Sequence, residues 1–372
     1  MTHQQSSHSD PIPATARFCS PFTFHYGHIE RLLLINFTGD PDTVYVGFEP
    51  QIVNDPVKGK GLLVIAWRQD GTIDVYHQPQ LTLQREDYDI VGDGLSDFIV
   101  CPFDDAQFLI GERGVDLNIE FTDKKGRTVR LHINEQNRRR RKPFGLLAPF
   151  PGASKKPPSM PLALLYDFYF VRRARTEISV EIDGRQHQLD MLPAPIDGSR
   201  VYFVRYSPDP FIVLFNPAYD GPLPVQSFQV GDSPELNGAI HEVQASGEHA
   251  AIKALRTSSQ RHQVRLSFTP AFPDLLHMQD GIDLKGTWHM DLEKAIGYIS
   301  GTYHVQRSSD RITIDMHPSD SWHPRITKLS VWFMFKVVPI FKHWPRSYHW
   351  HADIDLNQAE TPHLSARWYR TE

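Results

Sequence analysis

The chain has 372 residues, of which 40% are hydrophobic and 22% charged, and its formal net charge at pH 7 is -5. This composition excludes an intrinsically disordered chain, and the mild acidity gives no overall attraction to nucleic acid, so no nucleic-acid partner is expected. The length exceeds the usual single-domain range and makes two domains the default expectation. Cys19 and Cys101 are too few for a disulfide framework and lack the spacing of a structural zinc site.

The N-terminal segment has no basic stretch followed by an apolar one, so it does not resemble a secretory signal. We expect residues 1–20 to form a disordered tail and a cytoplasmic location to follow by default. The most apolar run, residues 329–341, contains Ser330, Lys336 and Pro339 and is too short to cross a bilayer as a helix. No transmembrane segment is predicted.

Strand patterns dominate the chain, and the turns between them are of the hairpin type. Residues 62–67 lead through Asp70-Gly71 to residues 73–77, and residues 115–121 lead through Lys125-Gly126 to residues 128–133. A third pair, residues 178–182 and 186–189, is joined by Asp183-Gly184, and a further strand is expected over residues 201–206. Helical periodicity is scarce, with short candidates at residues 248–256 and 290–295.

These patterns predict an all-β protein made of two antiparallel β-barrel or β-sandwich halves with few short helices. The segment 138–161 is basic and rich in proline, a composition that does not support continuous sheet pairing, and we interpret it as a linker or loop. It separates an N-terminal β domain, residues 21–137, from a C-terminal one, residues 162–372. The alternative is one large sandwich with this segment as a surface excursion. The basic run 138–142 is interpreted as a solvated surface, because no aromatic residues alternate with it to stack on bases.

Two carboxylates lie in the segment 45–57, which joins strands. Glu49 and Asp55 are candidate catalytic residues and would form an acid/base pair if the fold placed them across a cleft. For Asp55 the alternative is a turn in which its side chain bonds the local backbone before Pro56. His77, at the end of a strand, is either a ligand-binding residue at a rim or a half-buried strand histidine.

Gly286-Thr287-Trp288 and the stretch Gly297 to Tyr303 have the Gly-x-Trp and Gly-x-x-x-Gly-x-Tyr patterns found in calycins and lipocalins. Together with Trp368 near the C-terminus, they resemble the two-part lipocalin-like proteins related to carotenoid 1,2-hydratases and tocopherol cyclases. The resemblance covers roughly the last quarter of the chain, and no catalytic motif of that family matches a residue here. It implies an apolar cavity between β layers and acid-catalysed hydration or cyclisation of a hydrophobic substrate.

Aromatic residues gather toward the C-terminus, where they either line a ligand pocket or fill a β core. Trp322-His323-Pro324 and His343-Trp344-Pro345 end in proline, which favours a position at a rim. We therefore take Trp322, His323, Trp344 and Trp350 as candidate ligand-binding residues.

The segment 348–356 alternates with a period of two. Tyr348, Trp350, Ala352 and Ile354 point to one face, and His349, His351, Asp353 and Asp355 to the other. His349, His351 and Asp353 are candidate catalytic residues, but three groups on one strand cannot surround an ion, so a partner from a neighbouring strand is required, with His304 and His289 as candidates. The alternative is the solvated face of an ordinary strand. We assign no metal.

No nucleophile elbow, P-loop, His-Glu-x-x-His or dinucleotide motif is present, and no cofactor is expected. The leading functional prediction is binding of a small hydrophobic, isoprenoid-like ligand, with hydration or cyclisation as the enzymatic option. The alternatives are a carbohydrate-active or carbohydrate-binding protein, with Glu49 and Asp55 as its acid and base, and a non-catalytic interaction protein.

Overall fold

The computed structural model describes residues 15–137, 143–148, 157–196, 198–246, 249–293, 296–325, 332, 335–336, 344–357 and 361–370. The all-β prediction is confirmed, because strands dominate these residues and no helix of seven residues or more occurs among them. The described part of the chain also contains no helix long and apolar enough to cross a membrane. In the part of the chain that the structure describes, a 3-10 turn, η1, spans Arg85–Asp87.

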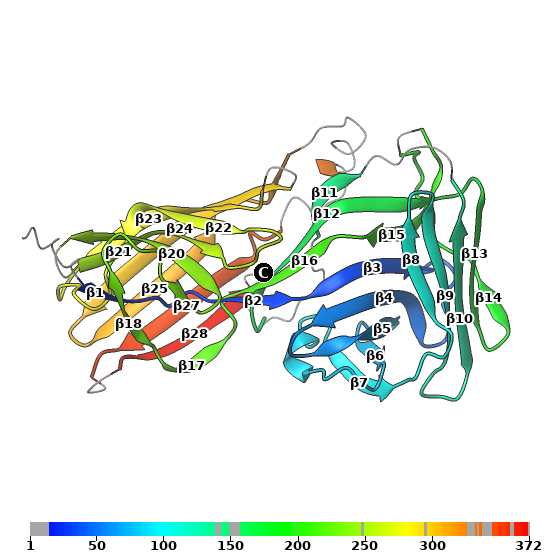
Figure 1. Cartoon of the computed structure of the whole chain (residues 1–372), viewed down its shortest axis with the longest axis horizontal. Helices are drawn as coiled ribbons and strands as arrows, with labels where there is room; N and C mark the ends of the chain where they lie inside the picture. Colours follow the sequence, from blue (N-terminus) through cyan, green and yellow to red (C-terminus); the bar gives the residue numbers. More distant parts are fainter. Residues whose placement is uncertain are drawn as a thin grey trace, which may run out of the picture.

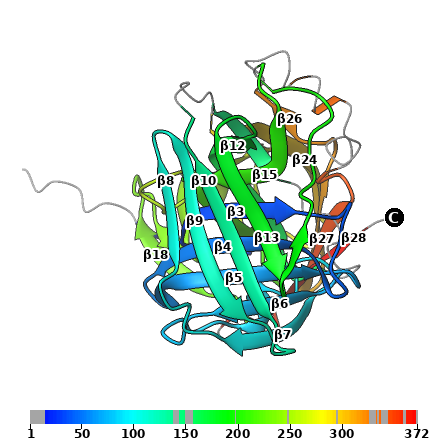
Figure 2. The ribbon, with the colours of Figure 1, turned by 90° about the vertical axis from the view of Figure 1, so that its right-hand side faces the viewer.

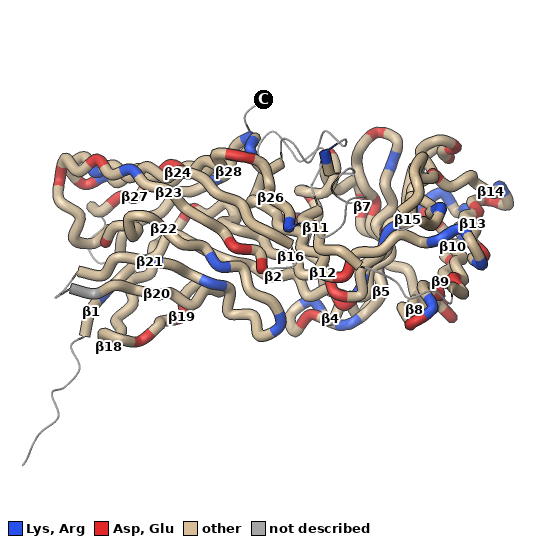
Figure 3. Tube along the Cα trace, turned by 90° about the horizontal axis from the view of Figure 1, so that it is seen from above, with Lys and Arg blue, Asp and Glu red and all other residues tan. Residues whose placement is uncertain are grey.

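The molecule is elongated, with two groups of sheets at its opposite ends (Figure 1). The N-terminal half holds a ten-stranded and a five-stranded sheet, and the C-terminal half holds an eleven-stranded sheet and a two-stranded one. Basic and acidic residues alternate along the trace of both halves, so neither sign covers an end of the molecule (Figure 3).

In the N-terminal half the ten-stranded sheet has the order β2-β16-β12-β15-β3-β4-β5-β6-β7, with β11 paired to β12 and with β6 and β7 parallel. Its strands are β2 Phe24–Gly27, β3 Ile29–Asn36, β4 Tyr45–Asp55, β5 Gly59–Arg68, β6 Ile73–His77, β7 Leu95–Val100, β11 Phe144–Ala148, β12 Met160–Arg172, β15 Val201–Ser207 and β16 Pro210–Phe215. The five-stranded sheet has the order β14-β13-β10-β9-β8, with β8 Gln107–Gly111, β9 Gly114–Thr122, β10 Thr128–Glu135, β13 Thr176–Ile182 and β14 Arg185–His187.

Side-chain alternation gives the ten-stranded sheet two different faces. The five-stranded sheet crosses one of them (Figure 2), and Leu33, Phe48 and Val64 pack there against Leu117 and Leu131 in a sandwich core. Their neighbours along β3, β4 and β5 point to the opposite face because successive strand residues alternate. That opposite face lines the cavity described below.

In the C-terminal half the eleven-stranded sheet has the order β17-β28-β27-β25-β24-β23-β22-β21-β20-β19, with β26 paired to β24. It curls around a core that contains Trp288, Tyr303, Trp350 and Trp368. Its strands are β17 Tyr219–Pro222, β19 Glu235–Leu236, β20 Ala239–Ser246, β21 His249–Thr257, β22 Arg265–Phe272, β23 Asp283–Asp291, β24 Gly297–Ser308, β25 Arg311–Pro318, β26 His323–Pro324, β27 Tyr348–Asp355 and β28 His363–Arg370. Strands β1 Thr15–Cys19 and β18 Val225–Gln229 form the two-stranded sheet.

The predicted hairpins are present. Strands β5 and β6, β9 and β10, and β13 and β14 pair antiparallel across the turns that carry Gly71, Gly126 and Gly184. Each of these glycines has a positive φ, which a hairpin turn requires and which other residues adopt at a cost.

Three expectations need correction. The tail was predicted over residues 1–20, but Thr15–Cys19 is strand β1, held by β18; residues 1–14 lie outside the described residues. The helix expected at 248–256 is strand β21 from His249 on, because pairing with β20 and β22 overrides the helical preference of its alanines. Of the helix expected at 290–295, Met290 and Asp291 are the end of strand β23, and residues 294–295 lie outside the described residues.

The boundary expected at 138–161 does not separate the sheets, since β13, β15 and β16 after it pair with β10, β3 and β2 before it. The pairing changes instead between β16 and β17, near residue 217. The basic run 138–142 and residues 149–156 of that segment lie outside the described residues.

Candidate functional site

A cavity of about 1140 Å³ lies against the free face of the ten-stranded sheet. This volume is above the range of about 300–1,000 Å³ that is usual for small-molecule sites. Apolar side chains from β3, β5, β11, β12, β15 and β16 make up most of the wall: Leu32, Leu34, Ile65, Leu146, Leu165, Phe168, Phe170, Phe203, Ile212 and Leu214. The lining is therefore suited to an apolar molecule.

Two charged side chains, Glu49 on β4 and Arg205 on β15, interrupt this apolar wall. Burial raises the pKa of the Glu49 carboxyl, while Gln51, Trp67 and Arg205 act in the opposite direction. Burial also lowers the pKa of Arg205 to about 10, against the attraction of Glu49. Both groups are thus withdrawn from water. Three further charged residues line the same cavity: Asp55, Lys58 and Asp87.

The hydrogen bonds of Glu49 and Arg205 within the protein do not use all of their polar atoms, so some are free to bind a ligand. Gln51 Nε2 donates to Glu49 Oε1 at 2.9 Å, and the Arg205 guanidinium donates to Asn36 Oδ1 and lies 3.9 Å from the centre of the Phe203 ring. Within the described residues, Arg205 Nε is buried and has no hydrogen-bond partner, whereas the side chain of Trp67 acts on the Glu49 carboxyl. A buried N–H donor without a partner in the wall of the cavity is a recognition element for an oxygen atom.

Asp55 lies at the edge of the same cavity and has a structural role. Its Oδ1 accepts the backbone N–H groups of Val57 at 2.8 Å and Lys58 at 2.9 Å, which is the turn considered from the sequence. Burial acts to raise the pKa of Asp55, but these two donors lower it. Lys58 then pairs with Asp87 of η1 at 2.7 Å, so an ion pair joins two segments at the rim.

The other predicted ligand-binding residues lie away from the cavity lining. Trp350 is fully buried in the core of the C-terminal half, and Trp322 and Trp344 are 3% and 5% exposed. His323 stacks on Tyr298, with ring centres 4.6 Å apart. His77 is 8% exposed and packs edge-on against Phe98. For the tryptophans, core packing is the role observed: all three belong to one hydrophobic cluster, Trp350 through the inward alternation of β27 and Trp322 and Trp344 from segments outside the strands.

His349, His351 and Asp353 lie on the outer face of β27, as the alternation predicted. The required partner comes from β25: Asp315 Oδ1 accepts His349 Nε2–H at 2.8 Å and His351 Nδ1–H at 2.9 Å. Burial acts to raise the pKa of Asp315, but the two imidazoles lower it. Asp353 pairs with Arg311 at 2.7 Å.

The partners predicted for this strand are wrong. His304 bonds Asp283 at 2.7 Å, and the ring of His289 lies 4.8 Å from that of Tyr298. His317, on β25, stacks on His349 with ring centres 4.0 Å apart instead. The strand order could not be read from the sequence, and β25 rather than β24 is the neighbour of β27.

Sequence reasoning missed Arg205 and a second group of ligand-type residues. Arg205 was detectable as the one charge in the otherwise apolar run 201–206, which indicates a strand buried on both faces. His249, Asp274 and His277 come together on the C-terminal half, and only the Asp-x-x-His spacing of the last two was visible in the sequence.

Comparison of the chain with protein-family models, with curated proteins and with solved structures finds no match. The class of protein is therefore defined by the fold and the site: an all-β chain with a large, mainly apolar cavity whose wall includes the Glu49 carboxyl group and the Arg205 guanidinium.

Proposed function

We propose that this protein binds a small, mainly apolar ligand of isoprenoid type in the cavity of the N-terminal half. The observation that carries the proposal is the cavity of about 1140 Å³ with a mainly apolar wall that includes Glu49 and Arg205. Burial of apolar surface supplies the affinity, at about 25 cal/mol per Å². Glu49 and Arg205 fix the polar end of the ligand.

Acid catalysis is the enzymatic form of the same proposal. A carboxyl group whose pKa is raised by burial keeps its proton nearer to neutral pH and serves as a general acid toward a double bond or hydroxyl of the ligand. Glu49 is the acid in this scheme, and Arg205 holds the polar group of the ligand. Hydration or cyclisation would both begin with such a proton transfer.

The carbohydrate alternative has weaker support, because the wall is mainly apolar and Asp55 is engaged in a turn. A cytoplasmic location and the absence of a nucleic-acid partner stay predictions.

Ligand binding is tested by native mass spectrometry of protein purified without detergent and by titration with geranylgeraniol, followed by intrinsic fluorescence. The Leu34→Trp variant fills part of the cavity and is expected to weaken binding by about tenfold or more, since the indole occupies ligand space. The matched control is Leu109→Trp on β8, where the side chain is 52% exposed, and it should bind as wild type. Equal binding by both variants, or no binding by the wild type, would contradict the proposal.

The roles of Arg205 and Glu49 are distinguished by two measurements, ligand binding and product formation. Arg205→Met should weaken binding of geranylgeraniol about tenfold and leave binding of the corresponding hydrocarbon unchanged, because only the alcohol offers an oxygen to Arg205. Glu49→Gln should retain binding and lose any hydration or cyclisation product detected by mass spectrometry. Undiminished product formation by Glu49→Gln would remove Glu49 as the acid.

A further inference from the structure

We propose that His249, Asp274 and His277 bind a divalent transition-metal ion, with Zn²⁺ as the reference ion. The three residues come from the first residue of β21 and from the loop between β22 and β23. They lie in the C-terminal half, away from the lining of the cavity described above, so this proposal is independent of the proposed function.

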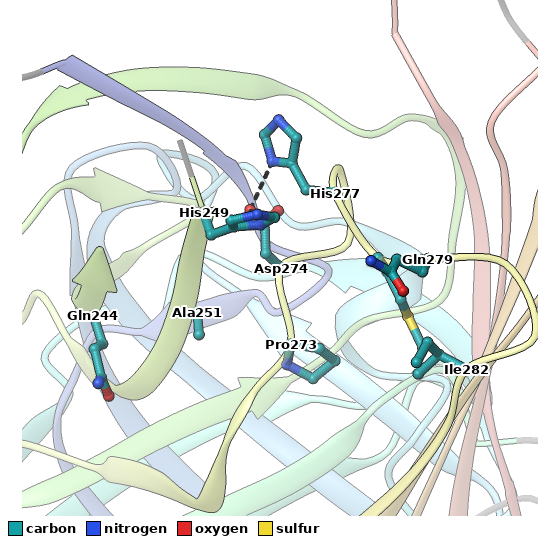
Figure 4. Close-up of a pocket in the computed structure, with 9 residues that line it drawn as sticks. Gln244, His249, Ala251, Pro273, Asp274, His277, Gln279 and Ile282 are labelled. Carbon is teal, nitrogen blue, oxygen red and sulfur yellow. Dashed lines mark hydrogen bonds and ion pairs between the residues drawn. The ribbon is translucent and has the colours of Figure 1, made fainter. Parts of the chain in front are cut away.

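The three side chains converge on one point. Their ligand atoms all lie within 4.8 Å of one another. His277 Nδ1–H donates to Asp274 Oδ2 at 2.8 Å, and His249 Nδ1 lies 3.9 Å from the same oxygen. Figure 4 shows both imidazoles next to the Asp274 carboxylate. Ligands at about 2.0–2.2 Å from a tetrahedral ion are themselves about 3.3 Å apart, so small side-chain rotations place all three around one ion.

The carboxylate of Asp274 is held in position by the protein before any ion binds. The backbone N–H of Ala250 donates to Asp274 Oδ2 at 2.9 Å and that of Leu276 to Oδ1 at 3.0 Å. The Asp274 side chain is only 8% exposed, whereas His249 and His277 are 66% and 35% exposed. A rigid carboxylate with two accessible imidazoles is a partly preorganised site that an ion can enter from solvent.

Two imidazole nitrogens and one carboxylate oxygen are a donor set that zinc and other transition ions accept. Such a set leaves at least one coordination position open. The three residues also line a pocket of about 400 Å³, together with Gln244, Gln279 and Ile282 (Figure 4). The open position therefore adjoins a space in which water or a small polar ligand reaches the ion.

A second group, Asp315, His317 and His349, also has its ligand atoms within 4.8 Å of one another and competes for the assignment. Its two imidazoles are stacked nearly parallel, at 18°, whereas the rings of His249 and His277 are inclined at 76°. Rings inclined to each other direct their nitrogen atoms to a common point more readily than stacked rings. We therefore assign the ion to the first group and use the second as the internal control.

The experiment uses the full chain after treatment with a chelator. Zn²⁺ binding is measured by isothermal titration calorimetry, and bound Co²⁺ by its visible absorption spectrum. We expect one tight equivalent in the wild type, with cobalt bands that lack thiolate charge transfer, because no cysteine belongs to the donor set. Loss of a residue that only orients a metal ligand costs about 10–100-fold in metal affinity, so His277→Ala, which removes a direct ligand, should cost at least about 100-fold.

His349→Ala is the matched control and should bind the ion as wild type does. His249→Ala is a second variant of an exposed side chain, chosen so that a folding defect in one variant does not decide the outcome; circular dichroism checks that both are folded. The proposal is overturned if His349→Ala loses the ion while His277→Ala and His249→Ala retain it. It is also overturned if the wild type takes up less than about a tenth of an equivalent.

Discussion

Two glycines in the C-terminal half allow aromatic rings to cross the neighbouring strand. Gly301 lies opposite Trp288, and Gly286 lies opposite Tyr303. A Cβ atom on Gly301 would lie 2.3 Å from the Trp288 ring and 2.1 Å from the backbone oxygen of His317, and one on Gly286 would lie 2.5 Å from the Tyr303 ring. The glycine and aromatic pattern seen in the sequence therefore has a packing reason.

Gly301→Ala is expected to destabilise the protein by about 1–3 kcal/mol, since the new methyl group overlaps a buried ring and a backbone oxygen that cannot both move. The matched control is Gly111→Ala, because a Cβ there meets nothing within 4 Å. Urea unfolding followed by tryptophan fluorescence gives both free energies of unfolding. Equal midpoints for the two variants would show that the sheet relaxes around the added methyl group.

For single residues, the sequence predicted which side chains belong to a site better than it predicted the residues that they contact. Glu49 was recognised as a candidate because the segment 45–57 was predicted to join strands; it lies instead within strand β4, where it is part of the cavity wall. Its neighbour Arg205 lies 156 positions later in the chain, on a strand reached only through the pairing of β15 with β3. No local pattern contains that pairing. The same applies to Asp315, whose contact with His349 depends on the order of β25 and β27.

At the level of strands and turns, one arginine side chain joins the two sheets of the N-terminal half. Arg127, in the turn between β9 and β10, contacts Asp42, which precedes β4, at 2.9 Å and Asp123 at 2.8 Å. The Asp123 side chain is fully buried, and that of Asp42 is 8% exposed. A buried carboxylate that loses its counter-charge is costly, so this contact holds a turn of one sheet to a turn of the other.

Arg127→Met should destabilise the protein by about 3–5 kcal/mol, because it leaves Asp123 and Asp42 uncompensated. Arg130→Met is the matched control: Arg130 also pairs with two carboxylates, Glu120 and Glu181, but its side chain is 52% exposed. Surface pairs contribute about 0–1 kcal/mol, so the control should be nearly neutral in the same unfolding assay. A cost for Arg127→Met no larger than that of the control would contradict the role of this contact.

The same contact predicts a pH dependence. Burial acts to raise the pKa of Asp42, but its bonds to Arg127 and to backbone N–H groups lower it to about 2, from an ordinary value of 3.8. The stabilisation is therefore complete above about pH 4 and is lost as the pH falls toward 2. The difference in unfolding free energy between wild type and Arg127→Met should narrow over this interval. A constant difference would mean that Asp42 does not titrate there.

The strands that the sequence predicted correctly are those that pair with the next strand along the chain. The hairpin of β5 and β6 is defined by residues only a few positions apart, and its turn carries Gly71. The boundary placed at 138–161 failed for the opposite reason, because β13, β15 and β16, which follow that segment, pair with β10, β3 and β2, which precede it by many residues. Strand β21 was mistaken for a helix, since its burial depends on two neighbours, β20 and β22.

In the whole molecule, the two halves share one hydrophobic core. The cluster around Phe24, Leu162 and Phe215 of the N-terminal half is continuous with the one around Phe268 and Trp368 of the C-terminal half. Trp368 Nε1–H donates to the backbone oxygen of Phe215 at 3.1 Å. A polar contact adds to this, since Asp209 accepts His262 Nε2–H at 2.9 Å.

Because the core is continuous, we expect one cooperative unfolding transition for the whole chain and not one for each half. Trp368→Ala should lower the midpoint of that single transition, at a cost of about 3–5 kcal/mol. Trp332→Ala, at a side chain that is 42% exposed, is the matched control and should leave it nearly unchanged. Scanning calorimetry makes the measurement, and two separate peaks in the wild type would refute the shared core as an energetic unit.

The pairing of β1 with β18 and of β17 with β28 bears on the order in which the chain can fold during synthesis. Strand β1 leaves the ribosome about 200 residues before β18, its partner, and β17 must wait for β28, the last strand along the described chain. The N-terminal half has all its strands once residue 215 is made. The growing polypeptide therefore carries a completed N-terminal half while β1 is still unpaired, and the C-terminal half can close only once β28 has been made.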